Sequence, residues 1–289
     1  MGHHLHGHGH GHAAGGGAPD WLPPALLLLA ACGAYLLLIR RARNRNPALG
    51  WSRWRTGCFL GGILLLGAAL LPPVASFAHE DFRGHMLQHL LIGMYAPLAL
   101  VLAAPVTLLL RTLPASRARR LTAVLHSPPA RVLTHPAVAL ALSAGGLAVL
   151  YFTPLYHATT AHPAAHWLLH AHFLLSGCLF AHAIAGPDPA PTRPGVRARL
   201  VYLGVAIAAH AVISQLMYGG FWVDIHAPVD QVQGGAEIMY YGGDLAELLL
   251  AAALVATWRP EPRRAAARGA WGRGARRGVV PARNVSGGS

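Results

Sequence analysis

Seven long apolar runs, each with almost no charged residue, alternate with shorter polar connections along most of the chain. A run of about 20 apolar residues is long enough to cross a bilayer as an α-helix, which satisfies its own backbone hydrogen bonds. The pattern therefore predicts an all-α integral membrane protein, a bundle of seven transmembrane helices within residues 21–258. The predicted spans are approximately 21–39, 57–77, 84–110, 136–153, 164–185, 200–218 and 233–257.

The third span, 84–110, is longer than a bilayer requires and contains Pro97 and Pro105. Proline lacks a backbone N–H, and its ring clashes with the preceding helical turn. We therefore expect this span to be kinked, tilted or broken near its inner end. The arginine-rich segment 111–131 that follows is expected to lie along the membrane surface.

Two tails flank the predicted bundle. Residues 1–20 are rich in glycine and histidine, and residues 259–289 are rich in arginine. Neither tail has an apolar face to bury, so both are predicted to be disordered. The first lacks the basic region with which a signal peptide begins. It could bind a metal such as copper loosely, through His3, His4, His6, His8, His10 and His12.

All 23 basic residues are arginine, and their placement predicts the orientation of the bundle. Six lie in 40–56, five in 111–135, three in 186–199 and eight after Trp258, whereas the intervening connections carry only Arg83. Because positively charged loops stay in the cytoplasm, the N-terminus is predicted outside and the C-terminus inside. The alternation agrees with seven spans.

Composition narrows the classes of function. Only 11% of the residues are charged and 54% are hydrophobic, as expected for a protein whose main partner is the lipid bilayer. The net charge of +13 is explained by arginines in loops, so no nucleic-acid binding is predicted. Cys32, Cys58 and Cys178 lie inside predicted spans without a CxxC motif and are interpreted as small buried residues. No nucleophile elbow, phosphate-binding loop, dinucleotide fingerprint or HExxH motif occurs, and no enzyme is predicted.

The start of the third span concentrates polar side chains in the sequence His85-Met86-Leu87-Gln88-His89. His85 and His89 are four residues apart, so a helix places them on one face. Polar groups within an apolar span are costly, and by default they indicate a functional site.

Further residues that can bind metal fall in the same outer leaflet under the predicted orientation. His166 and His170 repeat the four-residue spacing in the fifth span. Imidazole binds Cu(I) or Cu(II), thioether sulfur favours Cu(I), and carboxylates such as Glu237 can orient imidazoles. The sequence therefore predicts a copper site near the outer membrane face, formed by His85, Met86, His89, His166, His170, Met217, Asp230, Glu237 and Met239.

Three other interpretations stay open. A haem-binding membrane cytochrome would use one histidine from each of the third and fifth spans as axial ligands. A copper or proton-coupled transporter would use Asp244, Glu247 and His210 as an inward path. A structural scaffold would need neither histidine pair for metal binding. A single intramembrane histidine, such as His210 or His182, more often forms a hydrogen bond between helices.

Three stretches also resemble a known family. They are HMLQHLLIGMYAPLALVLAAPVTLLLR (85–111), HWLLHAHFLLSGCLFAHAIAGPDP (166–189) and DQVQGGAEIMYYGGDLAEL (230–248). In their order and position the sequence resembles the polytopic CtaG family of caa3-type cytochrome c oxidase assembly factors, over residues 50–258. Tyr240 and Asp244 stand where that family commonly has tryptophan and glutamate.

The resemblance implies a non-catalytic role in the maturation of a haem–copper oxidase in the bacterial cytoplasmic membrane. The chain would help copper reach the oxidase, with oxidase subunits and an extracytoplasmic copper donor as partners. The polar positions of the family correspond here to His85, Met86, Gln88, His89, His166, His170, Asp230, Gln231, Glu237 and Met239.

Overall fold

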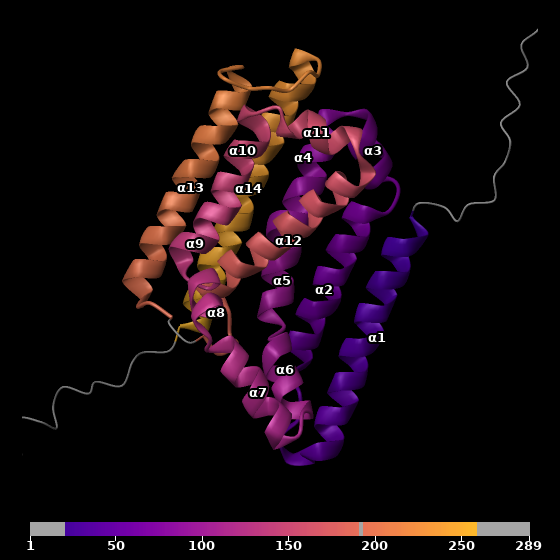
Figure 1. The fold of residues 1–289 in the computed structure, drawn as a ribbon, viewed down its shortest axis with the longest axis vertical. Coiled ribbons are helices and arrows are strands. Elements are labelled where there is room, and N and C mark those ends of the chain that lie inside the picture. Colours follow the sequence, from indigo (N-terminus) through magenta and orange to yellow (C-terminus); the bar gives the residue numbers. More distant parts are fainter. Residues whose placement is uncertain (1–20, 191–192, 259–289) are drawn as a thin grey trace, which may run out of the picture. The chain divides into compact units, whose positions relative to one another are not determined.

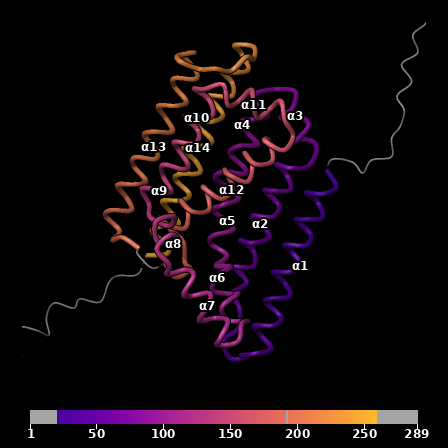
Figure 2. Tube along the Cα trace, viewed as in Figure 1, coloured from indigo at the N-terminus to yellow at the C-terminus, as the bar shows by residue number. Residues whose placement is uncertain are grey.

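The computed structural model describes residues 21–190 and 193–258, and within these ranges the chain forms helices and no β-strand (Figures 1 and 2). The two predicted tails lie outside the described residues. The main helices are α1 (Leu22–Arg45), α2 (Arg53–Leu70), α3 (Val74–Glu80), α4 (Phe82–Leu90), α5 (Ala96–Leu102), α6 (Pro105–Thr112), α7 (Ala115–Leu125), α8 (Pro128–Leu133), α9 (Pro136–Leu140), α10 (Gly146–Phe152), α11 (Leu155–Ala161), α12 (Pro163–Ala185), α13 (Val196–Tyr218) and α14 (Val229–Thr257).

The all-helical membrane prediction is confirmed, with five to seven candidate spans in the described residues. Five helices are long and apolar enough to cross a membrane individually: Leu22–Arg45, Phe82–Leu102, Pro163–Ala185, Val196–Tyr218 and Val229–Thr257. Two further candidates are bent pairs, Arg53–Leu70 with Val74–Glu80, bent by 40°, and Pro136–Phe152 with Leu155–Ala161, bent by 85°. Counting each bent pair as one span gives the seven that the sequence predicts.

The centre of the bundle is the continuous helix Phe82–Leu102, which is the most buried of the five long candidates. It consists of α4, the π-helical turn η2 (Leu91–Tyr95) and α5, and it packs against α2, α12 and α14. Pro97 is the second residue after the π-helical turn, and its missing N–H leaves the carbonyl of Gly93 without its usual helical donor. The wider turn therefore carries the helix through the proline that was expected to kink it.

The predicted break near the inner end of this span occurs at Ala104, before Pro105. Ala104 has a positive φ of 53°, a left-handed conformation that ends α5 and lets α6 begin at the proline. The buried carboxylate of Asp188 accepts hydrogen bonds from the backbone N–H groups of Val106 (3.1 Å) and Thr107 (2.8 Å). Asp188, which is 82 residues from Val106 in the sequence, thus satisfies the backbone donors at the start of α6.

The connections of the bundle fall at two opposite ends (Figure 1). One end, called the histidine end here, contains α3, α11 and the connection 219–228, with His79, His157, His162 and His226. The other, the arginine end, contains the α1–α2 connection and the helices α6 to α8, which include the exposed Arg-rich segment. The separation matches the predicted alternation of the loops, while the direction of the bundle across the membrane stays a prediction.

Candidate functional site at the histidine end

Three imidazole rings form a row at the histidine end. His79 lies on α3, and His166 and His170 are one turn apart on α12. The ring centroids of His79 and His166 are 5.5 Å apart, and those of His166 and His170 are 4.3 Å apart. His79 is exposed and the other two are half-buried, so the row leads from the surface into the bundle. These three residues are called the histidine row below.

The inner member of the row is oriented by an amide on the central helix. Gln88 donates from its Nε2 to the backbone carbonyl of Ala69 at 2.8 Å, which fixes its Oε1 as the atom facing His170. The Nε2 of His170 lies 3.2 Å from this oxygen and must therefore donate. In a neutral ring the lone pair then lies on Nδ1 of His170, and this buried atom has no hydrogen-bond partner in the described structure. A fixed ring with one free nitrogen is how proteins present a metal-binding histidine.

His85 and His89, the predicted pair on the third span, have different neighbours in the structure. Nε2 of His85 lies 3.3 Å from the hydroxyl of Tyr151, which also lies 3.9 Å from the Met86 sulfur. His89 packs edge-on against Phe173 at a centroid distance of 4.3 Å. Both histidines are more than nine-tenths buried, at 4% and 6% exposure. The two histidines lie on one helix, but their rings contact different residues of the neighbouring helices.

The remaining predicted ligands do not gather around the histidine row. Met86, Met217 and Met239 are fully buried in one hydrophobic cluster with other core residues, and the Met86 sulfur also accepts from the Tyr151 hydroxyl. Asp230 and Glu237 on α14 are exposed, so neither carboxylate is placed to orient a buried imidazole. Among residues 21–190 and 193–258, no three His, Cys, Asp or Glu side chains are close enough together to hold a metal ion.

Gln231, a residue of the third motif stretch, and Asp81, which precedes α4, both have structural roles. Gln231 accepts a hydrogen bond from the backbone N–H of Phe82 at 3.2 Å, which ties α14 to the start of α4. Asp81 precedes α4, and its side chain accepts from the backbone N–H of Arg83 at 2.8 Å. The guanidinium of Arg83 also bonds this carboxylate and holds the pKa of Asp81 below its usual value. These contacts fix the helix that carries His85 and His89.

A second imidazole contact lies at the surface of the histidine end. Nε2 of His157 on α11 is in direct contact with Nδ1 of His226, in the connection before α14. The carboxylate of Asp224 is 3.8 Å from the same nitrogen of His226. Both histidines are exposed, so a metal ion in solution could reach this pair.

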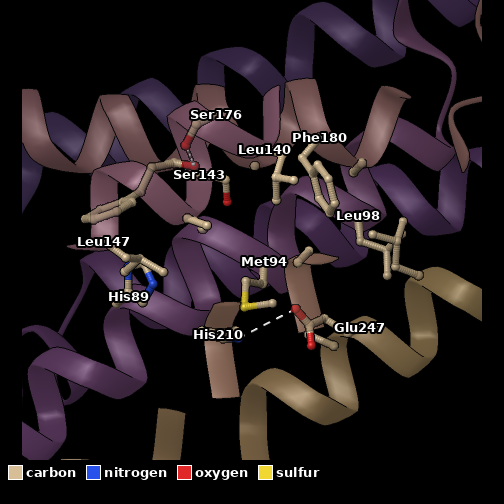
Figure 3. A pocket seen from close by; sticks show the side chains of 18 residues that line it. His89, Met94, Leu98, Leu140, Ser143, Leu147, Ser176, Phe180, His210 and Glu247 are labelled. Carbon is tan, nitrogen blue, oxygen red and sulfur yellow. Dashed lines mark hydrogen bonds and ion pairs between the residues drawn. The ribbon is translucent and has the colours of Figure 1, made fainter. Parts of the chain in front are cut away.

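A small pocket in the bundle is lined by His89, predicted as an outer copper ligand, and by His210 and Glu247, predicted only for a transporter path (Figure 3). Its volume is about 50 Å³, and its polar lining includes His89, His210 and Glu247, with the Met94 thioether alongside. Nδ1 of His210 is 3.7 Å from a carboxylate oxygen of Glu247, beyond hydrogen-bond distance. The transporter interpretation grouped His210 with Asp244 and Glu247, and the packing of α13 against α14 places His210 beside Glu247.

Comparison with known proteins agrees with the resemblance seen in the sequence. The chain matches the cytochrome c oxidase caa3 assembly factor family over residues 33–261. This chain belongs to that family. It is 31% identical over 255 residues to an uncharacterized protein of Mycobacterium leprae, a match that covers 81% of this chain and 38% of the relative. It is also 30% identical over 269 residues to an uncharacterized protein of Mycobacterium bovis, covering 83% of this chain and 40% of the relative.

The chain therefore spans about two fifths of the length of these mycobacterial relatives. No solved structure matches it significantly. The family is that of cytochrome c oxidase caa3 assembly factors, and the five to seven candidate spans of the described residues fit a multi-pass membrane protein.

Proposed function

We propose that this assembly factor binds copper at its histidine end and delivers it to a haem–copper oxidase during assembly. The observation that carries the proposal is the free Nδ1 of His170, on a ring that Gln88 orients through its Nε2. An unpartnered buried nitrogen costs free energy, and a bound metal ion removes that cost.

The donor chemistry of the histidine row suits copper as cargo. Imidazole nitrogen binds both Cu(I) and Cu(II), and carboxylate-poor surroundings disfavour magnesium and calcium. The rings of the row are near each other without forming a closed three-ligand set. A site that needs a small side-chain adjustment to close, and that is exposed at His79, can release its ion as readily as it captures it.

The position of the row fits a route from outside the cell. With the arginine end in the cytoplasm, the histidine end faces the extracytoplasmic side of the bacterial cell membrane. The exposed pair His157 and His226 and the His-rich segment 1–20 would then collect copper, in either oxidation state, from an extracytoplasmic donor protein. The half-buried end of the row would pass the ion to an oxidase subunit beside the bundle.

Copper titration of the detergent-purified full-length chain tests the proposal. The six tail histidines are replaced by alanine in every sample, so that only the membrane bundle is measured. We expect the copper equivalent bound at the histidine row to be lost in the double variant His166→Ala/His170→Ala. Binding should weaken at least tenfold in Gln88→Leu, because His170 then loses the acceptor that fixes its ring.

The matched control is His126→Ala/His135→Ala, which removes two exposed histidines from the arginine end. This control should bind copper like the parent protein. If the parent itself binds no copper, or if the two double variants lose it equally, the histidine row is not a copper site. The same samples give a visible spectrum, and a strong haem band lost with His166 and His170 would favour the cytochrome alternative instead.

A further inference from the structure

We propose that the pocket lined by His89, Met94, His210 and Glu247 is a second, membrane-buried position for a single Cu(I) ion. These four residues are called the inner pocket. The inference rests on the proposed copper-carrying function and extends it from the histidine end into the core of the bundle. His89 lies on the same face of α4 as His85, one turn further along the helix. It therefore connects the inner pocket to the histidine end.

Unpartnered polar atoms are the first observation. Nδ1 of His89, Nε2 of His210 and Oε2 of Glu247 have no hydrogen-bond partner among the described residues. The three side chains are only 6%, 5% and 3% exposed, so bulk water does not satisfy them. Each unsatisfied buried polar group lowers the stability of the fold. Three such groups around one space of about 50 Å³ indicate that this space takes a polar or charged guest.

Helix geometry is the second, independent observation. Two π-helical turns, η2 (Leu91–Tyr95) and η3 (Ala141–Gly145), both contribute residues to the pocket wall. A π-helical turn inserts one residue into the helix and redirects the side chains around it, and such turns occur frequently at functional sites. Met94 belongs to η2 and Ser143 to η3. Both π-helical turns of the described helices thus contribute to the wall of this pocket.

A close helix approach brings His210 into place. A Cβ atom added at Gly243 on α14 would collide with the imidazole ring of His210. The ring therefore occupies space that α14 leaves open only because residue 243 has no side chain. Glu247 is one turn further along the same helix, so Gly243 and Glu247 together set the wall that faces His210.

The charge and donor types select Cu(I). Within an apolar bundle, the single negative charge of the Glu247 carboxylate balances a monovalent cation, whereas a divalent ion would leave a net buried charge. Figure 3 shows the Met94 thioether on the pocket wall with His89, His210 and Glu247. Thioether sulfur and imidazole nitrogen are ligands that Cu(I) accepts, and thioether disfavours hard ions such as sodium. No three His, Cys, Asp or Glu side chains of the described residues are close enough together to hold a metal ion, so a bound Cu(I) would take only two of these donors directly, a number that Cu(I) accepts.

The test is Cu(I) titration of the full-length chain under reducing conditions, against a chromophoric Cu(I) chelator, with the tail histidines and the exposed pair His157 and His226 replaced by alanine. We expect two equivalents in the parent, one of which is lost in His166→Ala/His170→Ala. Glu247→Gln and Met94→Leu should each lose the other equivalent, or weaken it at least tenfold, and keep the first. The substitutions preserve side-chain shape, so the fold should be retained.

Matched controls are Met217→Leu, a buried methionine of the hydrophobic cluster, and Asp244→Asn, a carboxylate one turn before Glu247. Both should retain two equivalents. X-ray absorption of copper bound to His166→Ala/His170→Ala should show a sulfur neighbour, which Met94→Leu removes.

A parent protein that binds one equivalent, lost with the histidine row but unaffected at Glu247 and Met94, would overturn the inner pocket and leave the proposed function intact. Absence of the sulfur neighbour would likewise overturn it. If the equivalent that depends on Glu247 and Met94 is present but the row variants lose nothing, the inner pocket stands and the proposed outer site fails.

Discussion

The bundle contains two buried carboxylates that differ in their hydrogen bonding: Asp188 near the arginine end and Glu247 in the inner pocket. Asp188 is 4% exposed and accepts from two backbone N–H groups and from the hydroxyl of Thr107. Glu247 is 3% exposed, one of its oxygens has no partner among the described residues, and its nearest cation-forming group is 3.7 Å away. Equal burial therefore does not mean an equal role.

This difference in hydrogen bonding distinguishes a buried group with a structural role from one that is available for a ligand. A carboxylate whose oxygens are occupied by backbone donors stabilises the chain and has little capacity left for a ligand. A carboxylate left without donors costs stability, and proteins retain such groups chiefly where they bind or react. The same contrast applies to Gln88, whose amide is used at both atoms, and His170, which keeps one nitrogen free.

The largest expected effect is at Asp188. Replacement by alanine leaves two backbone donors at the start of α6 without partners, so Asp188→Ala should lower the free energy of unfolding by about 3 kcal/mol. Unfolding in mixed detergent micelles, followed by circular dichroism, measures the loss. Asp230→Ala removes an exposed carboxylate and is the control, with little expected change. Equal losses in the two variants would show that the bonds of Asp188 contribute nothing.

A close contact beside the inner pocket gives the second effect. A Cβ atom at Gly177 on α12 would collide with the backbone oxygen of Gly93 in η2. Backbone cannot move as a side-chain tip does, so Gly177→Ala should destabilise the protein by about 2 kcal/mol. In the same unfolding measurement, Gly61→Ala is the control, because nothing lies within 4 Å of the added atom. A neutral Gly177→Ala would mean that α12 and η2 are not held at this distance.

Much of the fold follows from the sequence because it depends on local patterns. Apolar length predicts the helices, Pro105 predicts the break after α5, and arginine counts predict which connections share an end. The span count is less direct, because α2 and α10 end in bends that hydrophobicity does not reveal.

The candidate site was predicted less completely, since it depends on contacts between distant residues. Four-residue spacing places His85 and His89 on one face, but Tyr151 and Phe173 on other helices decide what each ring meets. The sequence likewise cannot show that Glu237 is exposed while Glu247 is buried beside His210. Gly243 on α14 offers a sequence signal for that contact, recognisable only once α13 is known to be its neighbour.

A third carboxylate, Asp81, lies outside the central span and is paired with a cation at the surface. The bonds from Arg83 lower its folded-state pKa below the ordinary value of 3.8. A carboxyl with a depressed pKa stabilises the fold above its unfolded-state pKa, and this contribution disappears as the pH falls through the folded-state pKa. Asp81→Asn should therefore cost less than about 1 kcal/mol near neutral pH and still less below about pH 4. Unfolding of both proteins across this pH range checks it, and a difference that grows in acid would contradict it.

The smallest expected effect on stability is at Glu247, and it decides the comparison with Asp188. Glutamine has nearly the same shape, and the oxygen that changes makes no hydrogen bond within the described structure. Glu247→Gln should therefore change the free energy of unfolding of the copper-free protein by no more than about 0.5 kcal/mol, or raise it slightly. Unfolding without and with Cu(I) separates the two roles, because a ligand that binds only the folded state adds stability by mass action. Copper should stabilise the parent more than Glu247→Gln. A loss as large as that of Asp188→Ala in the copper-free protein would instead make Glu247 a structural group, and the two carboxylates would then differ only in position.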